Sequence, residues 1–497
     1  MPSPLPDSPL KVLFITPECA PLVKTGGLGD VSAALPAALR QAGVDARVLL
    51  PGYLPVLAAS RGARELATLD VLGHSVRILD AKLPSGVPLL VADCPALYAR
   101  GGGPYQADDG EDWEDNALRF GVLSKLAAML GTAASALKWR PDVVHCNDWP
   151  TALAPVYLHF APDRRAASLV TIHNLAFQGS YGFAQIAPLA LPAPSLGMEG
   201  LEFYGRVSFL KGGLVYADAV NTVSPTYARE IQTAQLGFGM DGVLRGRGER
   251  LYGVLNGIDT ATWNPEADPW IASRYGPLTL DRKAPNKREL RARMGLDAAG
   301  DRPLAAMVSR LTPQKGIDLV TDAADALVGL GLQIAVVGTG DRDLVARLEA
   351  ARARHPGNFA VVVGFDEELA HRVESGADMF LMPSRFEPCG MNQMYSQRYG
   401  TPPVATATGG LADTITDAEP KPTGFLMRAA TPDALVETTQ RALAAWKDPK
   451  RWRAIQLNGM SKDFGWTHAA SKYIEIYRKL VSEKRMGSDP IHQKNGV

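Results

Sequence analysis

Short apolar runs alternate along this chain with longer segments in which alanine and leucine recur at helical spacing. In the first half the predicted strands are residues 11–16, 46–50, 89–92, 142–146, 169–172 and 219–223. Most are apolar throughout, which is typical of parallel strands that helices cover on both faces. This half is therefore predicted to alternate between strand and helix around a parallel sheet.

The pattern breaks after Trp263, because residues 264–287 are polar and contain prolines. Further predicted strands follow at 304–308, 333–337, 359–363, 378–382 and 403–405. A chain of 497 residues exceeds what one hydrophobic core usually supports. We therefore predict an α/β protein with domains at 10–258 and 264–464, an amphipathic terminal helix at 465–481 and a disordered tail at 482–497.

The amino-acid composition limits which kinds of molecule this protein is expected to bind. Fifty-two basic residues balance fifty-two acidic ones, so no net charge favours nucleic acid or an anionic membrane. The cysteines Cys19, Cys94, Cys146 and Cys389 lack the spacing of a zinc site or a disulfide framework. The N-terminal residues lack the features of a signal peptide, and no apolar run is long enough to span a bilayer. We expect a cytoplasmic protein that binds a neutral or small molecule without metal or cofactor.

The segment 383–414 reads PSRFEPCGMNQMYSQRYGTPPVATATGGLADT and begins where the predicted strand 378–382 ends. In open α/β sheets, ligands bind outside the carboxyl ends of the strands. That position carries Arg385, Glu387, Cys389 and Gly390. An ordinary strand-to-helix loop is the alternative interpretation.

A second loop follows the predicted helix 392–399 and strand 403–405. It contains Thr408, Gly409 and Gly410, and we expect its flexible backbone to expose amides at the same edge of the sheet.

Two other loops have the composition of phosphate sites. Lys24, Gly26 and Gly27 precede a predicted helix at 31–41, where amides and a cation can meet a diphosphate. A tight turn capped by Asp30 is equally compatible, whereas GGLGDVS lacks the spacing of a dinucleotide-binding fingerprint.

The second loop, SRLTPQKG, places Arg310 and Lys315 after the strand 304–308, where both can turn toward a pyrophosphate. Alternatively, Lys315 is merely solvated. Asp341 and Asp343 form a DxD pattern, but they open a predicted helix, so we interpret them as capping residues and not as metal ligands.

Polar residues also follow two strands of the first half, as NDWPT at 147–151 and TIHNLAFQG at 171–179. Asp148, His173 and Asn174 are the candidates there, although a lone histidine is more often structural and Trp149 more often belongs to a core. Further along, Asn256 in LNGID begins a dipeptide typical of hairpins.

Taken together, KTGGLGD, HNLAFQG, LNGID, RLTPQKG, EPCG and TGGLAD resemble, in order, the motifs of bacterial glycogen synthases and plant starch synthases. The resemblance spans roughly residues 11–480. It implies a GT-B fold of two facing Rossmann-like domains with a deep interdomain cleft, and a terminal helix that returns to the first domain. It also implies retaining transfer of glucose from ADP-glucose to the non-reducing end of an α-1,4-glucan such as glycogen.

The resemblance further implies roles for individual residues. Arg310 and Lys315 would bind phosphate, Glu387 sugar hydroxyls, and His173 the anomeric side of the donor glucose. Substrate binding, to the nucleotide sugar or the acceptor, is implied for Lys24, Gly26, Gly27, Asp30, Asp148, Asn174, Asn256, Phe365, Cys389, Gly390, Thr408, Gly409 and Gly410. Because these residues come from both predicted domains, we also expect the domains to close during catalysis, with hinges near 256–263 and again before the terminal helix.

At two positions the sequence differs from related enzymes. Pro150 stands where the family usually has histidine, so we assign that position no side-chain role. Tyr395 stands where many related transferases have a second glutamate, so a two-carboxylate displacement is not supported. A glucan phosphorylase, which would need lysine-bound pyridoxal phosphate, and a non-catalytic glucan-binding module remain the alternatives.

Overall fold

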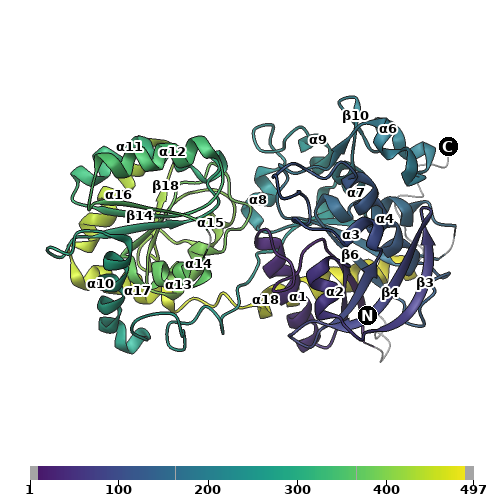
Figure 1. Ribbon diagram of the computed structural model, residues 1–497, viewed down its shortest axis with the longest axis horizontal. Coiled ribbons are helices and arrows are strands. Elements are labelled where there is room, and N and C mark those ends of the chain that lie inside the picture. Colours follow the sequence, from purple (N-terminus) through teal and green to yellow (C-terminus); the bar gives the residue numbers. More distant parts are fainter. Residues whose placement is uncertain (1–8, 163, 365, 487–497) are drawn as a thin grey trace. The chain divides into compact units, whose positions relative to one another are not determined.

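The computed structural model describes residues 9–162, 164–364 and 366–486. The chain divides into two compact units (Figure 1). Of the described residues, unit 1 contains those from 9 to 223, from 228 to 256 and from 466 to 486, and unit 2 contains those from 224 to 227 and from 257 to 465. None of the described helices is long and apolar enough to cross a bilayer.

Unit 1 is built on a nine-stranded sheet with the order β12-β11-β7-β6-β1-β2-β5-β4-β3. Its strands are β1 (Lys11–Ile15), β2 (Asp45–Pro51), β3 (Arg64–Val71), β4 (His74–Lys82), β5 (Pro88–Asp93), β6 (Val143–Asn147), β7 (Ala167–Ile172), β11 (Ala219–Thr222) and β12 (Leu251–Gly253). The strands from β12 to β5 pair in parallel. β3 and β4 extend the sheet in antiparallel fashion, so the prediction of a purely parallel sheet is wrong at this edge.

The antiparallel extension lacks the apolar runs that mark the other strands. In β3 most side chains are exposed or half-buried, and in β4 buried positions alternate with exposed ones. Only one face of these strands contacts the core, so their apolar content is low. Leu72 and Gly73, both with positive φ, form the two-residue turn between them.

Helices cover this sheet and a small three-stranded sheet adjoins it. The helices are α1 (Gly27–Gln41), α2 (Leu54–Ala59), α3 (Pro95–Tyr98), α4 (Asn116–Leu130), α5 (Leu153–His159), α6 (Phe183–Ile186), α7 (Phe209–Tyr216), α9 (Asp241–Gly246) and α18 (Trp466–Arg485). A further helix, α8 (Pro225–Glu230), has its first residues in unit 2 and its last in unit 1. The small sheet has the order β8-β10-β9 and consists of Ser180–Tyr181, Arg206–Ser208 and Glu202–Phe203.

The terminal helix α18 belongs to unit 1, and its Tyr477 hydroxyl lies 2.7 Å from His145 Nδ1 in β6. The helix continues to Arg485, so the prediction of a disordered tail from residue 482 is wrong for its first residues. The rest of that predicted tail, 487–497, lies outside the described residues.

Unit 2 has a six-stranded, wholly parallel sheet with the order β15-β14-β13-β16-β17-β18. The strands are β13 (Leu304–Val308), β14 (Gln333–Gly338), β15 (Phe359–Val363), β16 (Met379–Met382), β17 (Pro403–Thr406) and β18 (Phe425–Met427). The parallel sheet predicted for this half is confirmed, and β18 is an additional strand.

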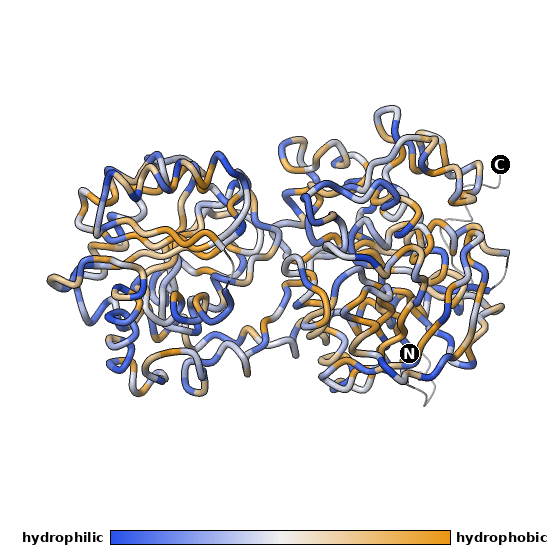
Figure 2. Tube along the Cα trace, in the orientation of Figure 1, coloured by the Kyte–Doolittle hydropathy of each residue, from blue (hydrophilic) through white to orange (hydrophobic). Residues whose placement is uncertain are grey.

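Two hydrophobic cores fill the two faces of the sheet of unit 2. In β13, Ala305 and Met307 belong to one core, while Leu304, Ala306 and Val308 belong to the other, as the alternation of a strand requires. The helices are α10 (Ala284–Met294), α11 (Ile317–Gly329), α12 (Arg342–Arg354), α13 (Glu367–Gly376), α14 (Asn392–Arg398), α15 (Gly409–Thr414), α16 (Pro432–Trp446) and α17 (Pro449–Met460). Figure 2 shows the apolar strands inside this unit and hydrophilic segments on its outer helices.

Candidate functional site

The glycine-rich loop of unit 1 leads directly into α1. The helix begins at Gly27, with Gly26 as its N-cap in extended backbone conformation. Asp30 lies within the first helical turn and its Oδ1 is 2.8 Å from Lys24 Nζ. The interpretation of Asp30 as the capping residue is therefore wrong, since Asp30 pairs with Lys24 instead.

Glu18 holds this loop in place from the end of β1. Its Oε2 accepts hydrogen bonds from the amides of Thr25 (2.6 Å) and Gly26 (3.2 Å), and its Oε1 accepts one from the Tyr105 hydroxyl (2.6 Å). Burial raises the pKa of this carboxyl. The Gly26 amide is thus already bonded to a carboxylate, and a phosphate would have to displace Glu18 there. Sequence reasoning missed Tyr105, which lies 87 residues from Glu18 without any local signal.

Asp148 and His173 follow the adjacent strands β6 and β7. Asp148 has a positive φ of 56°, which is rare for a residue with a side chain. Its Oδ1 accepts hydrogen bonds from the amides of His173 (2.7 Å) and Asn174 (3.4 Å). Asp148 therefore fixes the loop that carries both candidates, and the structure brings Asp148, His173 and Asn174 together.

His173 is a neutral imidazole with an assignable tautomer. Asn147 Nδ2 donates to the carbonyl of Ile15, so the Asn147 Oδ1, 3.0 Å from His173 Nε2, is the acceptor of the pair. His173 Nε2 consequently carries the proton, and Nδ1 is left as an acceptor. Desolvation by burial lowers the pKa of His173 to about 3, so the ring is uncharged at neutral pH.

A pH dependence of stability follows from Asp148. Burial raises the pKa of this carboxyl to about 7, above the value of about 3.9 in an unfolded chain. Between these values the folded state holds a proton that the unfolded state has lost, so stability falls as the pH rises. We expect the free energy of unfolding of the unchanged protein, measured by urea titration, to fall by about 1.4 kcal/mol per pH unit from pH 4 to 7 relative to Asp148→Asn. Parallel pH profiles of the two proteins would contradict this assignment.

Trp149 belongs to a cluster of aromatic rings. It packs edge-on against Phe120 with ring centres 4.9 Å apart, and it also contacts Tyr105, Tyr181 and Phe209. The structure thus supports the interpretation of Trp149 as a packing residue. Pro150 is buried beside it, and its carbonyl accepts a hydrogen bond from Ser124.

Asn256 lies in an irregular segment after β12 and forms no hairpin, so that interpretation of LNGID is wrong. The residue is 6% exposed. Within the described ranges, its Oδ1 has no hydrogen-bond partner. A buried amide oxygen without a partner costs free energy, which makes Asn256 a candidate for ligand binding.

In unit 2, the parallel strands β13 and β16 are neighbours, and the loops that follow them meet. Lys315 Nζ lies 2.6 Å from Glu387 Oε2, with side chains 17% and 6% exposed. Ser384 Oγ donates a further hydrogen bond to Glu387 Oε2 at 3.1 Å. The two loops therefore meet at one edge of the sheet, and the interpretation of Lys315 as simply solvated is wrong, because it is paired with Glu387.

The backbone also joins these two loops. The Arg385 amide donates to the carbonyl of Gln314 (2.8 Å), and Gln314 Nε2 donates to the carbonyl of Phe386 (3.2 Å). Gly316 has a φ of 71°, and a Cβ there would lie 2.2 Å from the Pro383 carbonyl oxygen. The loops thus form one packed layer.

The two arginines of this region differ in their surroundings. Arg385 is paired with Asp318 of α11, where its Nη1 lies 2.8 Å from Asp318 Oδ1. This pairing lowers the pKa of Asp318, and it ties the loop at 383–390 to α11. The Arg310 side chain, in contrast, is exposed.

The loop at 408–410 packs beneath the loop at 387–390. The Gly410 amide donates to the Glu387 carbonyl at 3.0 Å, and Thr408 and Cys389 are buried. A Cβ on Gly409 would lie 1.9 Å from the Glu387 carbonyl oxygen, and one on Gly410 would lie 1.9 Å from the Cys389 carbonyl oxygen. The expectation that this turn exposes its amides is wrong for Gly410, because its amide is hydrogen-bonded to Glu387. A glycine is needed at this position because the two backbones pack so closely.

The structure also shows where several other predicted residues lie. Gly390 has a φ of 70° and begins the turn into α14. The Asp341 side chain accepts hydrogen bonds from the amides of Asp343 and Leu344, which confirms its capping role. The Tyr395 ring stacks on Trp263 with centres 3.8 Å apart, so it packs inside unit 2. Phe365, predicted to stack on adenine, lies outside the described residues.

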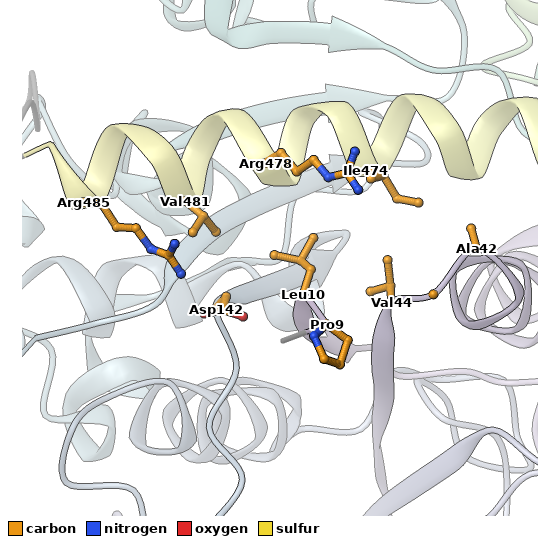
Figure 3. Close-up of a pocket in the computed structure, with 10 residues that line it drawn as sticks. Pro9, Leu10, Ala42, Val44, Asp142, Ile474, Arg478, Val481 and Arg485 are labelled. Atoms are coloured by element: carbon orange, nitrogen blue, oxygen red, sulfur yellow. The ribbon is translucent and has the colours of Figure 1, made fainter. Parts of the chain in front are cut away.

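A small cavity lies elsewhere in unit 1, between α18 and the end of α1 (Figure 3). Leu10, Val44 and Ile474 line it together with Arg478 and Arg485. No predicted site residue is among its lining residues, so it has no part in the site described above.

Comparisons with known proteins fit this geometry. Residues 11–246 match the family described as the starch synthase catalytic domain, and residues 290–456 match glycosyl transferases group 1. A glycogen synthase of Aromatoleum aromaticum is 54% identical, with 94% of this chain and 96% of the relative covered. A glycogen synthase of Nitrosomonas eutropha is 50% identical, with 98% and 100% covered. The chain belongs to the glycogen synthase family.

Solved structures agree with this membership. The catalytic domain of starch synthase IV from Arabidopsis thaliana, solved with ADP and acarbose, has a TM-score of 0.84 and 31% identity, covering 96% of this chain and 100% of that one. Sucrose-phosphate synthase from Thermosynechococcus elongatus, 20% identical over 95% and 99% of the two chains with a TM-score of 0.58, shares the fold alone. The chain is thus a glycosyltransferase with the GT-B fold, and both fold class and family are as the sequence predicted.

Proposed function

We propose that this glycosyltransferase moves glucose from ADP-glucose to the non-reducing 4-hydroxyl of an α-1,4-glucan, with retention of configuration. The observation that carries the proposal is the Lys315–Glu387 pair, at the carboxyl ends of two neighbouring parallel strands. The names of the relatives and the ADP and acarbose bound to the starch synthase neighbour support it.

The chemistry explains why a cation and a carboxylate suit this place. As ADP departs, negative charge grows on its phosphate and positive charge grows at the anomeric carbon. Lys315 and the exposed Arg310 would stabilise the phosphate, and Glu387 would accept hydrogen bonds from sugar hydroxyls. Because Lys315 already contacts Glu387 at 2.6 Å, the phosphate and the sugar would bind next to each other.

His173 would serve as a neutral hydrogen-bonding group. With its proton on Nε2, its Nδ1 can accept a hydrogen bond from a sugar hydroxyl, while Asp148 holds its backbone. Its low pKa makes it unsuited to supply a positive charge. We propose that the remaining candidates contact the nucleotide sugar. They are Lys24, Asp30, Asn174, Asn256, Gly26, Gly27, Phe365, Cys389, Gly390, Thr408, Gly409 and Gly410.

We further propose a cytoplasmic location, without nucleic acid or membrane as partner. The four cysteines are free and buried, which suits a reducing compartment.

A donor panel tests the proposal. Purified protein is given glycogen and ADP-glucose, UDP-glucose or GDP-glucose, and the nucleoside diphosphate released is measured. We expect the highest kcat/KM with ADP-glucose, and unchanged activity in excess EDTA because basic side chains meet the phosphate charge. Equal turnover of UDP-glucose would contradict the donor assignment, and loss in EDTA that magnesium or manganese reverses would contradict metal independence.

A further inference from the structure

Several exposed aromatic side chains gather near the His173 loop of unit 1. Tyr204 is 81% exposed, Phe177 51% and Phe238 37%, and the half-buried Phe203 packs against Tyr204 with ring centres 4.7 Å apart. We call these four residues the aromatic surface. Exposed apolar groups that gather on a soluble domain commonly mark an interaction site.

Hydrogen bonds and close contacts bring the four residues together from three segments. Gln178, next to Phe177, donates from Nε2 to the carbonyl of Phe238 at 3.0 Å. A Cβ on Gly239 would lie 3.0 Å from Phe203 Cζ and 3.3 Å from Tyr204 Cε2. The turn at Phe238 therefore lies against the β9–β10 turn and is tied to the segment that follows His173; Figure 1 shows β10 and α9, which flank these turns.

The backbone holds two of these rings in an unfavourable conformation. Tyr204 has a φ of 49° and Phe238 one of 47°, and each precedes a glycine that also has positive φ. Asparagine, aspartate or glycine usually occupies such a turn position, because a bulky side chain is strained there. Only five non-glycine residues in the described part of the chain have positive φ, and Asp148 is another of them. Such strain concentrates where ligands bind.

The aromatic surface continues directly from the proposed sugar site. The Phe177 amide donates to the carbonyl of Asn174 at 3.2 Å, so Phe177 belongs to the same loop as His173 and Asn174. A glucan has many sugar units beyond the one that reacts, and the flat C–H faces of glucose pack well on aromatic rings while its hydroxyls stay in water.

We propose that the aromatic surface binds a stretch of the α-glucan acceptor behind its reacting end. This inference rests on the proposed function, because it takes a glucan as the acceptor. The rings would hold the polymer by stacking and contribute little to short acceptors, which end before they reach the surface.

The test uses Tyr204→Gly, Phe238→Gly and the double variant, and leaves Phe177 unchanged because it shares a loop with His173. Leu278→Ala is the matched control, since Leu278 is an apolar side chain of unit 2 that is 96% exposed. Affinity electrophoresis through gels containing glycogen measures binding without any donor. We expect each glycine variant to weaken glycogen binding about tenfold and the control to leave it unchanged.

Two further readouts distinguish a binding surface from a structural one. Glycine adopts positive φ without strain, so the variants should unfold at a temperature no lower than that of the unchanged protein. The KM for glycogen should rise, while kcat with maltotriose stays the same. Unchanged glycogen binding by the folded double variant would overturn the proposal, as would an altered oligomeric state with unchanged glycogen binding. If the unchanged protein transfers no glucose at all, the proposed function fails, while the gel still measures glucan binding.

Discussion

Replacing Lys315 by alanine is expected to lower kcat by roughly 10²–10³-fold, with a smaller effect on the KM for ADP-glucose. The ammonium group would bind the diphosphate more strongly as negative charge grows on it, so its removal raises the barrier rather than weakening ground-state binding. Steady-state kinetics with glycogen as acceptor measures the effect.

Arg310→Ala should also lower kcat. In the double variant, the fold-decrease in kcat should be smaller than the product of the two single decreases, because both cations act on one diphosphate.

Lys287→Ala is the matched control for Lys315→Ala. Lys287 Nζ lies 2.7 Å from Asp378 Oδ2, and the two side chains are 13% and 15% exposed, so this is a similarly buried ion pair of the same unit. Lys287 Nζ also lies 3.0 Å from Asp301 Oδ1, on a side chain that is 81% exposed. Loss of either lysine leaves a mostly buried carboxylate without its cation and should destabilise the protein by about 3 kcal/mol. Only Lys315→Ala should lower kcat. A folded Lys315→Ala protein with unchanged kcat and a raised KM would show that Lys315 merely anchors the donor.

Gly410→Ala is expected to lower kcat/KM by about 10²-fold and to destabilise the protein by about 3 kcal/mol. The added methyl group would lie 1.9 Å from the Cys389 carbonyl oxygen and 2.5 Å from its Cα, so the backbone of the Glu387 loop must move. A shift of this loop would displace Glu387 from Lys315. Urea unfolding and steady-state kinetics measure the two effects.

Gly329→Ala serves as the control for this substitution. Gly329 ends α11, and a Cβ there would have no atom within 4 Å. Alanine should leave activity unchanged and, if anything, stabilise the helix by up to about 1 kcal/mol. Equal stability and activity of Gly410→Ala and Gly329→Ala would mean that the loop at 408–410 does not position Glu387.

Most of the buried parallel strands could be predicted from the sequence because they leave a continuous apolar run, whereas the three-residue strands β12 and β18 are too short to do so. The strands at Leu304–Val308 and Phe359–Val363 lie where the pattern placed them. β3 and β4 could not be found in this way, because strands with one solvated face carry many polar residues. The strands of the small sheet have only two or three residues and are too short to leave any periodic signal.

The candidate site was predictable in its location but not in its pairings. Parallel strand ends share one edge of a sheet, so a meeting of the loops that carry Lys315 and Glu387 followed from topology. The sequence did not predict which charged residues pair there, because acidic residues lie near both Arg385 and Lys315 along the chain. Only the packing of the loops shows that Arg385 pairs with Asp318 and Lys315 with Glu387. The contact of Tyr105 with Glu18 depends on tertiary structure alone.

The most direct test of the proposed reaction follows the anomeric carbon during transfer. The protein is incubated with ADP-glucose labelled with ¹³C at C1 and a maltooligosaccharide acceptor, and NMR records the first bonds formed. The proposal predicts that ADP is released in equal amount to new α-1,4 linkages at the non-reducing end. Label that appears only in free glucose, or in β-linkages, would contradict the account.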